Sequence, residues 1–308
     1  MTVKEVAEPK WLQIGYAKSG NFWLYRILQC IAGYAGIEQK SFIQNQSIYS
    51  IAQEWNLNFE GQTKIDVIDI ETDRFCYTIS SVFRMPIRDL DDYVTCCSHV
   101  WMHAVWGPVT ETVLSKFTKV IYIVRDPRDV AVSLGHFVST PYGFGTSFLP
   151  QPSLLLFLKE NFSSILEFWA SHVCGYLKQK ERLNIHFVIY ERLLADFDGE
   201  LARLLGYLGI SLRPEVRKAV REETCFGSMK SGSPSHLRKG ERGQWREVLS
   251  KRQLYFADKF VGDLISIFQS NQKDAVEINR VIKKTEARVF VNKFFRAIKT
   301  FSKSQIYP

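Results

Sequence analysis

Cysteine is scarce and scattered in this sequence, with six residues among 308. No two cysteines have the Cys-x-x-Cys spacing, so the sequence contains no zinc-ribbon pattern. A chain this long with so few cysteines is not a disulfide scaffold of the small secreted kind. We therefore expect reduced thiols, a cytoplasmic protein and no bound metal.

Long apolar runs are also missing. No stretch of about 18 apolar residues occurs, and this excludes an obvious membrane-spanning helix. Residues 1–10 carry two acids and two lysines without an apolar centre, so we expect no signal peptide. No internal repeat or domain linker is evident, and the length suits one large α/β domain.

The composition is that of a folded protein with an anionic partner. Apolar residues make up 46% of the chain, which is ample for a large core and argues against extensive disorder. The net charge of +8 favours a nucleic acid, a phosphorylated cofactor, a charged glycan or a membrane surface. Charge alone does not choose among these partners.

Strand-like and helix-like patterns alternate along the chain. Residues 119–124 form a mostly β-branched run that is typical of a strand buried on both faces of a parallel sheet. Other strand-like segments are 11–16, 63–70, 75–83, 93–99 and 184–190, and helical spacing covers 21–31, 127–138, 154–178 and 245–268. The alternation predicts an α/β fold of three layers, with a mostly parallel central sheet flanked by helices.

The first chemically informative segment follows the first strand. Gly15 and Gly20 have the spacing of a nucleotide P-loop, where backbone N–H groups converge on an anion at a helix N-terminus. A Walker A loop would continue with Gly-Lys-Ser or Gly-Lys-Thr, but here Asn21 and Phe22 follow, and Lys18 lies inside the loop. The segment therefore favours a phosphate-binding loop other than that of an ATPase.

Two further segments carry cations where ligands bind in α/β proteins. Arg125 ends the strand at 119–124, and Ser133 lies two helical turns beyond it. A guanidinium and a hydroxyl at this edge are suited to one phosphate group. Arg238-Lys239-Gly240 adds two cations beside a glycine in a later loop, at 224–243.

Together these segments resemble the sulfotransferase family, in its order and with fitting separations, over residues 11–245. Residues 16–23 are similar to the family's Tyr-Pro-Lys-Ser-Gly-Thr-Thr-Trp loop, and Arg125 with Ser133 resembles its 3′-phosphate pair. The resemblance implies a P-loop-like fold and the cofactor 3′-phosphoadenosine 5′-phosphosulfate (PAPS), whose product is 3′,5′-bisphosphoadenosine (PAP). The cofactor site that it implies consists of Lys18, Ser19, Gly20, Asn21, Phe22, Trp23, Arg125, Ser133, Tyr190, Thr224, Phe226, Met229, Arg238, Lys239 and Gly240.

The sequence departs from the family pattern in the first loop. Ala17 stands where the family has Pro, and Asn21 and Phe22 stand where it has two Thr. Two hydroxyl contacts to phosphate are therefore lost, although the Asn21 amide is still able to donate. Residues 246–255 do not reproduce the family's small dimer motif, so no dimer is implied.

The resemblance also implies the catalytic groups. Lys18 is suited to stabilising charge on the leaving phosphate, and a His should act as general base. The family places this base at the end of the strand before Arg125. We favour His99, in a Cys-Ser-His context that resembles the family's Lys-Thr-His, over His103, whose distance from Arg125 is closer to the usual one.

The sequence thus predicts a sulfotransferase that moves a sulfuryl group from PAPS to a hydroxyl or amine of a small-molecule or lipid acceptor. Two alternatives stay open: a catalytically impaired nucleotide-binding protein of the same fold, and a P-loop nucleotide kinase. No nucleic-acid module is recognisable, so we expect no nucleic-acid partner.

The last part of the chain has a different composition. We divide the chain into a sulfotransferase domain at 1–270 and a basic amphipathic extension at 271–308. Residues 280–303 hold eight Lys or Arg and a single acid, Glu286, with Phe at 290, 294, 295 and 301. A helix packed on the core by its Phe face is the favoured interpretation, and peripheral membrane contact is the alternative.

Overall fold

Seven strands form one sheet in the computed structural model, which describes residues 9–57, 59, 61–71, 74–140, 153–232, 240–270 and 274–304. The strands are β1 (Trp11–Gly15), β2 (Asp66–Glu71), β3 (Arg74–Ile79), β4 (Phe83–Pro86), β5 (His99–Met102), β6 (Lys119–Val124) and β7 (Ile185–Ile189). Their order across the sheet is β4-β3-β2-β5-β1-β6-β7, and β2, β5, β1, β6 and β7 are parallel. Only the β2–β3 and β3–β4 pairs are antiparallel among the described strands.

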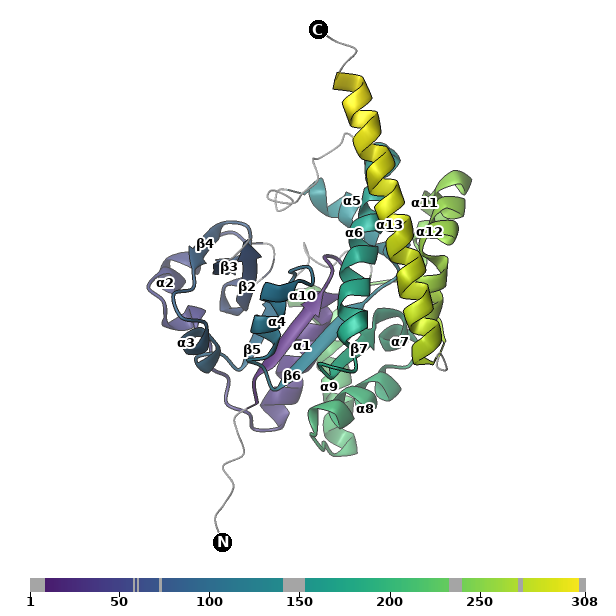
Figure 1. Ribbon diagram of the computed structural model, residues 1–308. Helices are drawn as coiled ribbons and strands as arrows, with labels where there is room; N and C mark the ends of the chain where they lie inside the picture. The colour runs from purple at the N-terminus through teal and green to yellow at the C-terminus, as the bar shows by residue number, and fades with distance from the viewer. Residues whose placement is uncertain are drawn as a thin grey trace.

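Helices fill the connections between the strands (Figure 1). The α-helices are α1 (Asn21–Tyr34), α2 (Ile48–Ala52), α3 (Leu90–Thr95), α4 (Pro108–Leu114), α5 (Pro127–Val138), α6 (Leu154–Gln179), α7 (Tyr190–Ala195), α8 (Phe197–Leu208), α9 (Pro214–Thr224), α10 (Phe226–Gly232), α11 (Trp245–Val248), α12 (Lys251–Gln269) and α13 (Ala275–Ser304). Two short 3₁₀ helices, η1 (Ile43–Asn45) and η2 (Gln62–Lys64), lie before β2.

The alternating side chains of β6 show how the three layers arise. Val120, Tyr122 and Val124 point into a core cluster that includes side chains of α6 and α12. Ile121 and Ile123 point to the other face and join a cluster with side chains of α1, α8 and α9. The strand is buried on both faces because helices cover both sides of the sheet.

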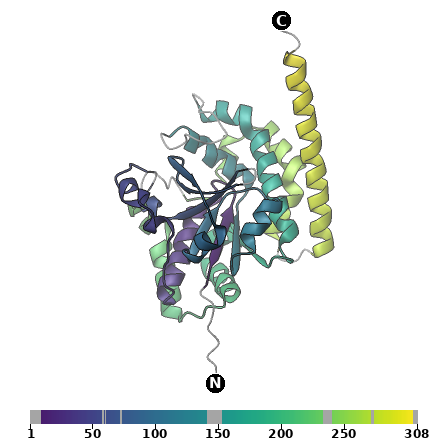
Figure 2. The same ribbon diagram turned by 60° about the vertical axis from the view of Figure 1, so that its left-hand side comes forward.

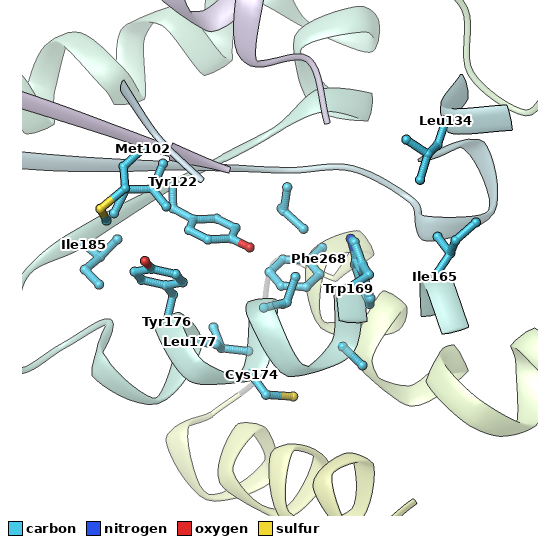
Figure 3. Packing of buried hydrophobic residues seen from close by; sticks show 14 of the residues in the cluster. Met102, Tyr122, Leu134, Ile165, Trp169, Cys174, Tyr176, Leu177, Ile185 and Phe268 are labelled. Carbon is cyan, nitrogen blue, oxygen red and sulfur yellow. The ribbon is translucent and has the colours of Figure 1, made fainter. Parts of the chain in front are cut away.

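Aromatic side chains occupy the centre of the larger cluster (Figure 3). Tyr122 from β6 and Tyr176 from α6 face each other, with ring centroids 5.2 Å apart. Trp169, also on α6, is 1% exposed in the same layer. This packing fixes α6 against the sheet directly behind the carboxyl ends of β5 and β6.

The sequence predicted most of these elements. The strand at 119–124 and the helix at 127–138 have the bounds expected, and the mostly parallel sheet between helical layers confirms the predicted fold class. The strand expected at 93–99 is wrong. Residues 90–95 form α3, because the Asp89 side chain accepts the N–H groups of Asp91 and Asp92 and caps a helix there. The strand starts only at His99.

The last described helix, α13, packs against α6 and α12. Figures 1 and 2 show that its carboxyl-terminal part projects beyond the rest of the molecule. Across the described ranges, none of the helices combines the length and the apolar character needed to cross a membrane.

Candidate active site

A cavity of about 1170 Å³ lies at the edge of the sheet where β1, β5 and β6 end. Predicted site residues that line it are Lys18, Gly20, Asn21, Phe22, Trp23, His103, Arg125, Ser133, Tyr190, Phe226, Met229 and Gly240. We call the wall formed by the loops after β1 and β6 and by residues 240–245 the loop side. The opposite wall, which we call the strand side, comes from β2, β3, Phe59 and Trp101.

The loop after β1 is wound tightly by its own hydrogen bonds. Lys18 has a φ of 65° and Gly20 a φ of 96°, so two of its residues adopt the left-handed conformation. The Ser19 N–H donates to the Tyr16 carbonyl at 3.2 Å, and the Asn21 side-chain amide donates to the same oxygen at 2.9 Å. One N–H of the Asn21 side-chain amide therefore stabilises its own loop.

Arg125 joins the segments that form the loop side. Its guanidinium donates to the carbonyl of Lys18 at 3.2 Å and to that of Glu241 at 2.9 Å. Its Cζ lies 4.2 Å from the centroid of the Tyr190 ring. Arg125 is 9% exposed, so a fixed cation stands at the point where the loops after β1 and β6 meet residues 240–245.

Asp129 is a functional residue that the sequence analysis missed. It lies in the first turn of α5, is 3% exposed, and accepts the N–H of Gly243 at 2.6 Å and that of Trp245 at 3.2 Å. The carboxylate therefore holds residues 243–245 against α5, close to Gly240 on the cavity wall. The sequence offered one signal for it: the segment at 125–129 contains a second acid, Asp129, besides the Asp126 that caps the helix.

His103 follows β5 directly and reaches the cavity wall. Its Nδ1 lies 2.6 Å from the Gly15 carbonyl, which only accepts, so Nδ1 carries the proton and Nε2 has the lone pair. The His103 side chain is exposed on the cavity wall. Desolvation by neighbouring protein atoms, aided by the Lys18 cation, lowers the pKa of His103 and outweighs the opposing effects of the Gly15 hydrogen bond and of Asp69. The direction of this shift favours the neutral imidazole.

Side chains from α6 fix the backbone that carries His103. His172 Nε2 donates to the His103 carbonyl at 3.2 Å, and its Nδ1 accepts the Tyr122 hydroxyl at 2.8 Å. The Tyr176 hydroxyl donates to the Ala104 carbonyl at 2.7 Å. Burial lowers the pKa of His172 to about 3, so this histidine stays neutral and has a positioning role.

His99 lies at the wrong end of its strand for the role that the sequence suggested. It opens β5, where it pairs in register with Trp11 at the start of β1, whereas the cavity is at the other end of both strands. Its Nδ1 lies 2.9 Å from the Gln29 side-chain amide, its ring stacks on Tyr25, and it is 6% exposed. The expectation that His99 ends the strand is wrong, because β5 begins six residues later than the predicted strand.

Four other predicted residues are not placed on the wall. Ser19 is fully buried within the loop after β1 and does not line the cavity. Thr224 is fully buried and its hydroxyl donates to the Val220 carbonyl at 2.7 Å, so it is not exposed to the cavity. Arg238 and Lys239 lie outside the described residues, as does the loop at 141–152. His136, for which the sequence gave no site role, lines the cavity.

The strand side is mainly aromatic and aliphatic. Phe22 and Phe59 have ring centroids 4.3 Å apart and cluster with Ile65, and Trp101 packs against the same group. Near them, Asp69 forms an ion pair with Arg84, and both line the cavity. Within the described part of the chain, no group of three or more His, Cys, Asp or Glu side chains is arranged to hold a metal ion.

The loop side fits a phosphorylated nucleotide. Ser19 Oγ and Arg125 Nε are buried without a hydrogen-bond partner, although such polar atoms are normally satisfied. A Cβ at Gly20 would come within 2.5 Å of the Tyr190 ring, so only glycine allows the close approach of loop and ring. Donors, a fixed cation and aromatic rings therefore meet on one wall.

Comparison with known proteins agrees with this geometry. A human protein named sulfotransferase 2B1 is 29% identical over 260 residues, which cover 78% of this chain and 61% of the relative. A mouse protein named sulfotransferase 2A1 is 29% identical, with 82% and 83% covered. The chain spans less than two-thirds of the length of the human relative, and 66% of a rat sulfotransferase 2B1 at 27% identity.

Solved structures have the same fold. Mouse sulfotransferase SULT7A1 complexed with PAP aligns with a TM-score of 0.57 at 20% identity, covering 91% of this chain and 89% of that one. Retinol dehydratase in complex with androsterone and PAP aligns with a TM-score of 0.56 at 18% identity, covering 86% and 82%. The family model described as the sulfotransferase domain matches residues 8–273. The chain therefore belongs to the sulfotransferase domain family.

Proposed function

We propose that the protein transfers a sulfuryl group from PAPS to the hydroxyl or amine of an acceptor. The observation that supports this most directly is the position of Arg125, whose guanidinium binds both the Lys18 and the Glu241 carbonyl. Through it, three separate segments that resemble the family's donor-binding motifs come together on one wall of one cavity.

The loop side would hold the donor. Arg125 and Ser133 would bind the 3′-phosphate, and Ser19 with the backbone N–H groups after it would bind the 5′-phosphosulfate. When bound, PAPS supplies the sulfuryl group and a phosphate leaving group. Lys18, whose Nζ lies 4.2 Å from the centroid of the Phe137 ring, would stabilise charge that develops on that phosphate.

His103 would be the general base. Because Nδ1 donates to Gly15, Nε2 is the nitrogen that takes a proton from the acceptor. The lowered pKa keeps this nitrogen unprotonated at pH 7. Its place at the boundary of the loop side and the strand side suits a group that must reach both donor and acceptor.

The acceptor would be a small molecule or a lipid bound on the strand side. Aromatic side chains there suit an apolar body, as in the androsterone or retinol of the structural relatives. The cysteines are all free thiols, which suits a reducing, cytoplasmic location. Residues 271–308 would form an extension able to contact a membrane at its surface.

The test of the donor site is calorimetric titration of the protein with PAP, beside ATP with Mg²⁺. We compare the wild type with the double variant Lys18→Ala/Arg125→Ala. Tight binding of PAP, weak binding of ATP and loss of PAP binding in the double variant are expected, because the variant removes both cations from the loop side.

The outcomes separate the three functions. Failure to bind PAP would overturn the proposal, and tight binding of ATP with Mg²⁺ would point to the kinase alternative. If PAP binds but no sulfuryl transfer occurs to sterols, phenols, retinoids or amines, the impaired nucleotide-binding protein would be favoured. The Asn21 amide, which is used inside its own loop, is the feature that keeps that alternative relevant.

A further inference from the structure

The first half of α13 is attached firmly to the protein. Val281, Ile282, Thr285 and Val289 are buried at spacings that define one helix face. Ion pairs reinforce the attachment: Lys284 lies 2.8 Å from Asp263 of α12, and Glu286 lies 2.6 Å from Lys178 of α6. This part is a packed helix, but its packed face is mainly aliphatic, so the expectation that the helix packs by its Phe face is wrong for Phe290 and Phe294.

Beyond Val289 the helix presents apolar side chains to solvent instead. Phe290 is 71% exposed, Val291 50% and Phe294 56%, and we call these three residues the tip surface. Asn292, which lies between Val291 and Phe294 in the sequence, points instead toward α6, where its side-chain amide donates to the Glu167 side chain. Phe290 and Phe294 therefore lie outside the packed face of the helix. Exposed aromatic residues gathered at one place usually mark a binding surface.

The charge around the tip surface has one sign. No acidic residue follows Glu286 in the sequence, whereas residues 288–303 contain five Lys or Arg. Arg288 binds the Phe260 carbonyl and pairs with Asp263, so its charge is partly used within the protein. Lys293 is exposed between the tip-surface residues. The projecting helix thus combines aromatic and cationic character.

We propose that the tip surface binds an anionic lipid bilayer. Phe290 and Phe294 would enter the interfacial region, and Lys293 would lie among negatively charged headgroups, to which the positive charge of this part of the sequence is attracted. A second copy of the chain is a poorer occupant, because it would bring two strongly basic helices together without acids to compensate.

The position of the tip surface relates this contact to the cavity. Figures 1 and 2 show the free end of α13 pointing toward the same end of the molecule as the arrowheads of β1 and β6. The cavity opens among the loops at that edge of the sheet. A protein bound through α13 would bring this edge toward the lipid, which favours an acceptor dissolved in the membrane. This last step rests on the proposed function, whereas the membrane contact itself does not.

The test is cosedimentation of the full chain with vesicles. Vesicles of phosphatidylcholine alone are compared with vesicles that also contain phosphatidylserine, for the wild type, Phe290→Ser/Phe294→Ser and a control, Ile51→Ser/Val276→Ser. The control removes two side chains that are 58% and 78% exposed but lie on α2 and at the start of α13. PAP affinity is measured for each variant by calorimetry.

We expect the wild type and the control to sediment only with the anionic vesicles. The tip variant should partition about tenfold more weakly or worse, because two aromatic side chains no longer leave water. Its PAP affinity should be unchanged, which shows that it is folded. The proposal is overturned if the wild type does not sediment with anionic vesicles, or if the control loses as much vesicle binding as the tip variant. It is also overturned if analytical ultracentrifugation without lipid shows that the tip surface forms a dimer interface instead. Absence of PAP binding in every variant would contradict the donor site and leave the vesicle result intact.

Discussion

The two walls of the cavity are built in different ways. On the loop side, backbone groups and charged side chains hold one another: Arg125 binds two carbonyls, and Asp129 binds two N–H groups. On the strand side, Phe22, Phe59 and Ile65 meet through packing. Hydrogen bonds require set geometry, whereas apolar contacts tolerate changes of shape at similar volume.

This difference explains why the sequence indicates the proposed donor more clearly than an acceptor. A phosphate group needs cations and N–H donors at particular points, and such residues occur at recognisable spacings in a sequence. An apolar acceptor needs only a hydrophobic space of suitable shape, and the residues around it look like ordinary core. The predictions below test whether the two walls are as independent as their construction suggests.

The largest effect is expected at the residue between the walls. His103→Gln should lower turnover by roughly a hundredfold to ten-thousandfold, because the base is lost. PAP affinity should stay near the wild-type value, since the cations of the loop side are untouched. Transfer of radiolabelled sulfate from PAPS to whichever acceptor a panel of sterols, phenols and amines identifies gives the turnover, and calorimetry gives the affinity.

His99→Gln is the matched control. Its ring is buried at the far end of β5, so turnover should remain close to that of the wild type. The pH profile adds a second check. Because the His103 pKa of the ligand-free protein lies below the ordinary 6.5, its basic form persists as pH falls, and the acid limb of kcat/KM should appear only below pH 6.5. An acid limb above pH 6.5, or a loss of turnover in His99→Gln but not in His103→Gln, would contradict the proposal that His103 is the base.

The two histidines also show where prediction from the sequence ends. The strand at 119–124 was clear because a buried parallel strand is a continuous apolar run, and Asp126-Pro127 marks the start of a helix. The segment before His99 was misread because Val94 and Thr95 suggest a strand, while Asp89 caps a helix over them. The later start of the strand, at His99, is the reason that His103 is the histidine on the cavity wall and the proposed base.

Other features depend on tertiary contacts that no local pattern records. Asp129 gained its role from the return of residues 243–245 to α5, more than a hundred residues later in the chain. Phe59 reaches the cavity from the segment between α2 and η2, in a polar part of the sequence that gave few signals of structure. The residues proposed to contact the donor were thus recognisable in the sequence, whereas the residues that position them and those on the strand side were not.

An intermediate effect is expected from Asp129→Asn. The substitution removes the charge that strengthens both hydrogen bonds to residues 243–245, so this segment should be held less firmly. Hydrogen bonds to charged groups are worth about 1.5–3 kcal/mol, and we expect PAP to bind about tenfold to a hundredfold more weakly. Calorimetry with PAP and with adenosine 5′-phosphate measures the effect and its dependence on the 3′-phosphate.

The ratio of the two affinities distinguishes positioning from general damage. Loosening of the wall that includes Gly240 should weaken PAP binding much more than adenosine 5′-phosphate binding. Asp126→Asn is the control, because Asp126 caps α5 and pairs with Arg128 without accepting from residues 243–245 in the described contacts. Equal losses for both nucleotides, or the same change of ratio in the control, would mean that Asp129 only stabilises the fold.

The smallest effect, and the most selective, is expected on the strand side. Phe59→Leu shortens a strand-side residue that packs against Phe22, without removing a donor or a charge, so PAP affinity should not change. Bulky acceptors that fill this wall should lose about tenfold in kcat/KM, while compact phenols should lose little. Phe256→Leu, at a partly buried position in the core away from the cavity, controls for a general loss of packing. If Phe59→Leu weakens PAP binding as much as it weakens bulky acceptors, the two walls are coupled, and the separation between a fixed donor wall and an adaptable acceptor wall does not hold.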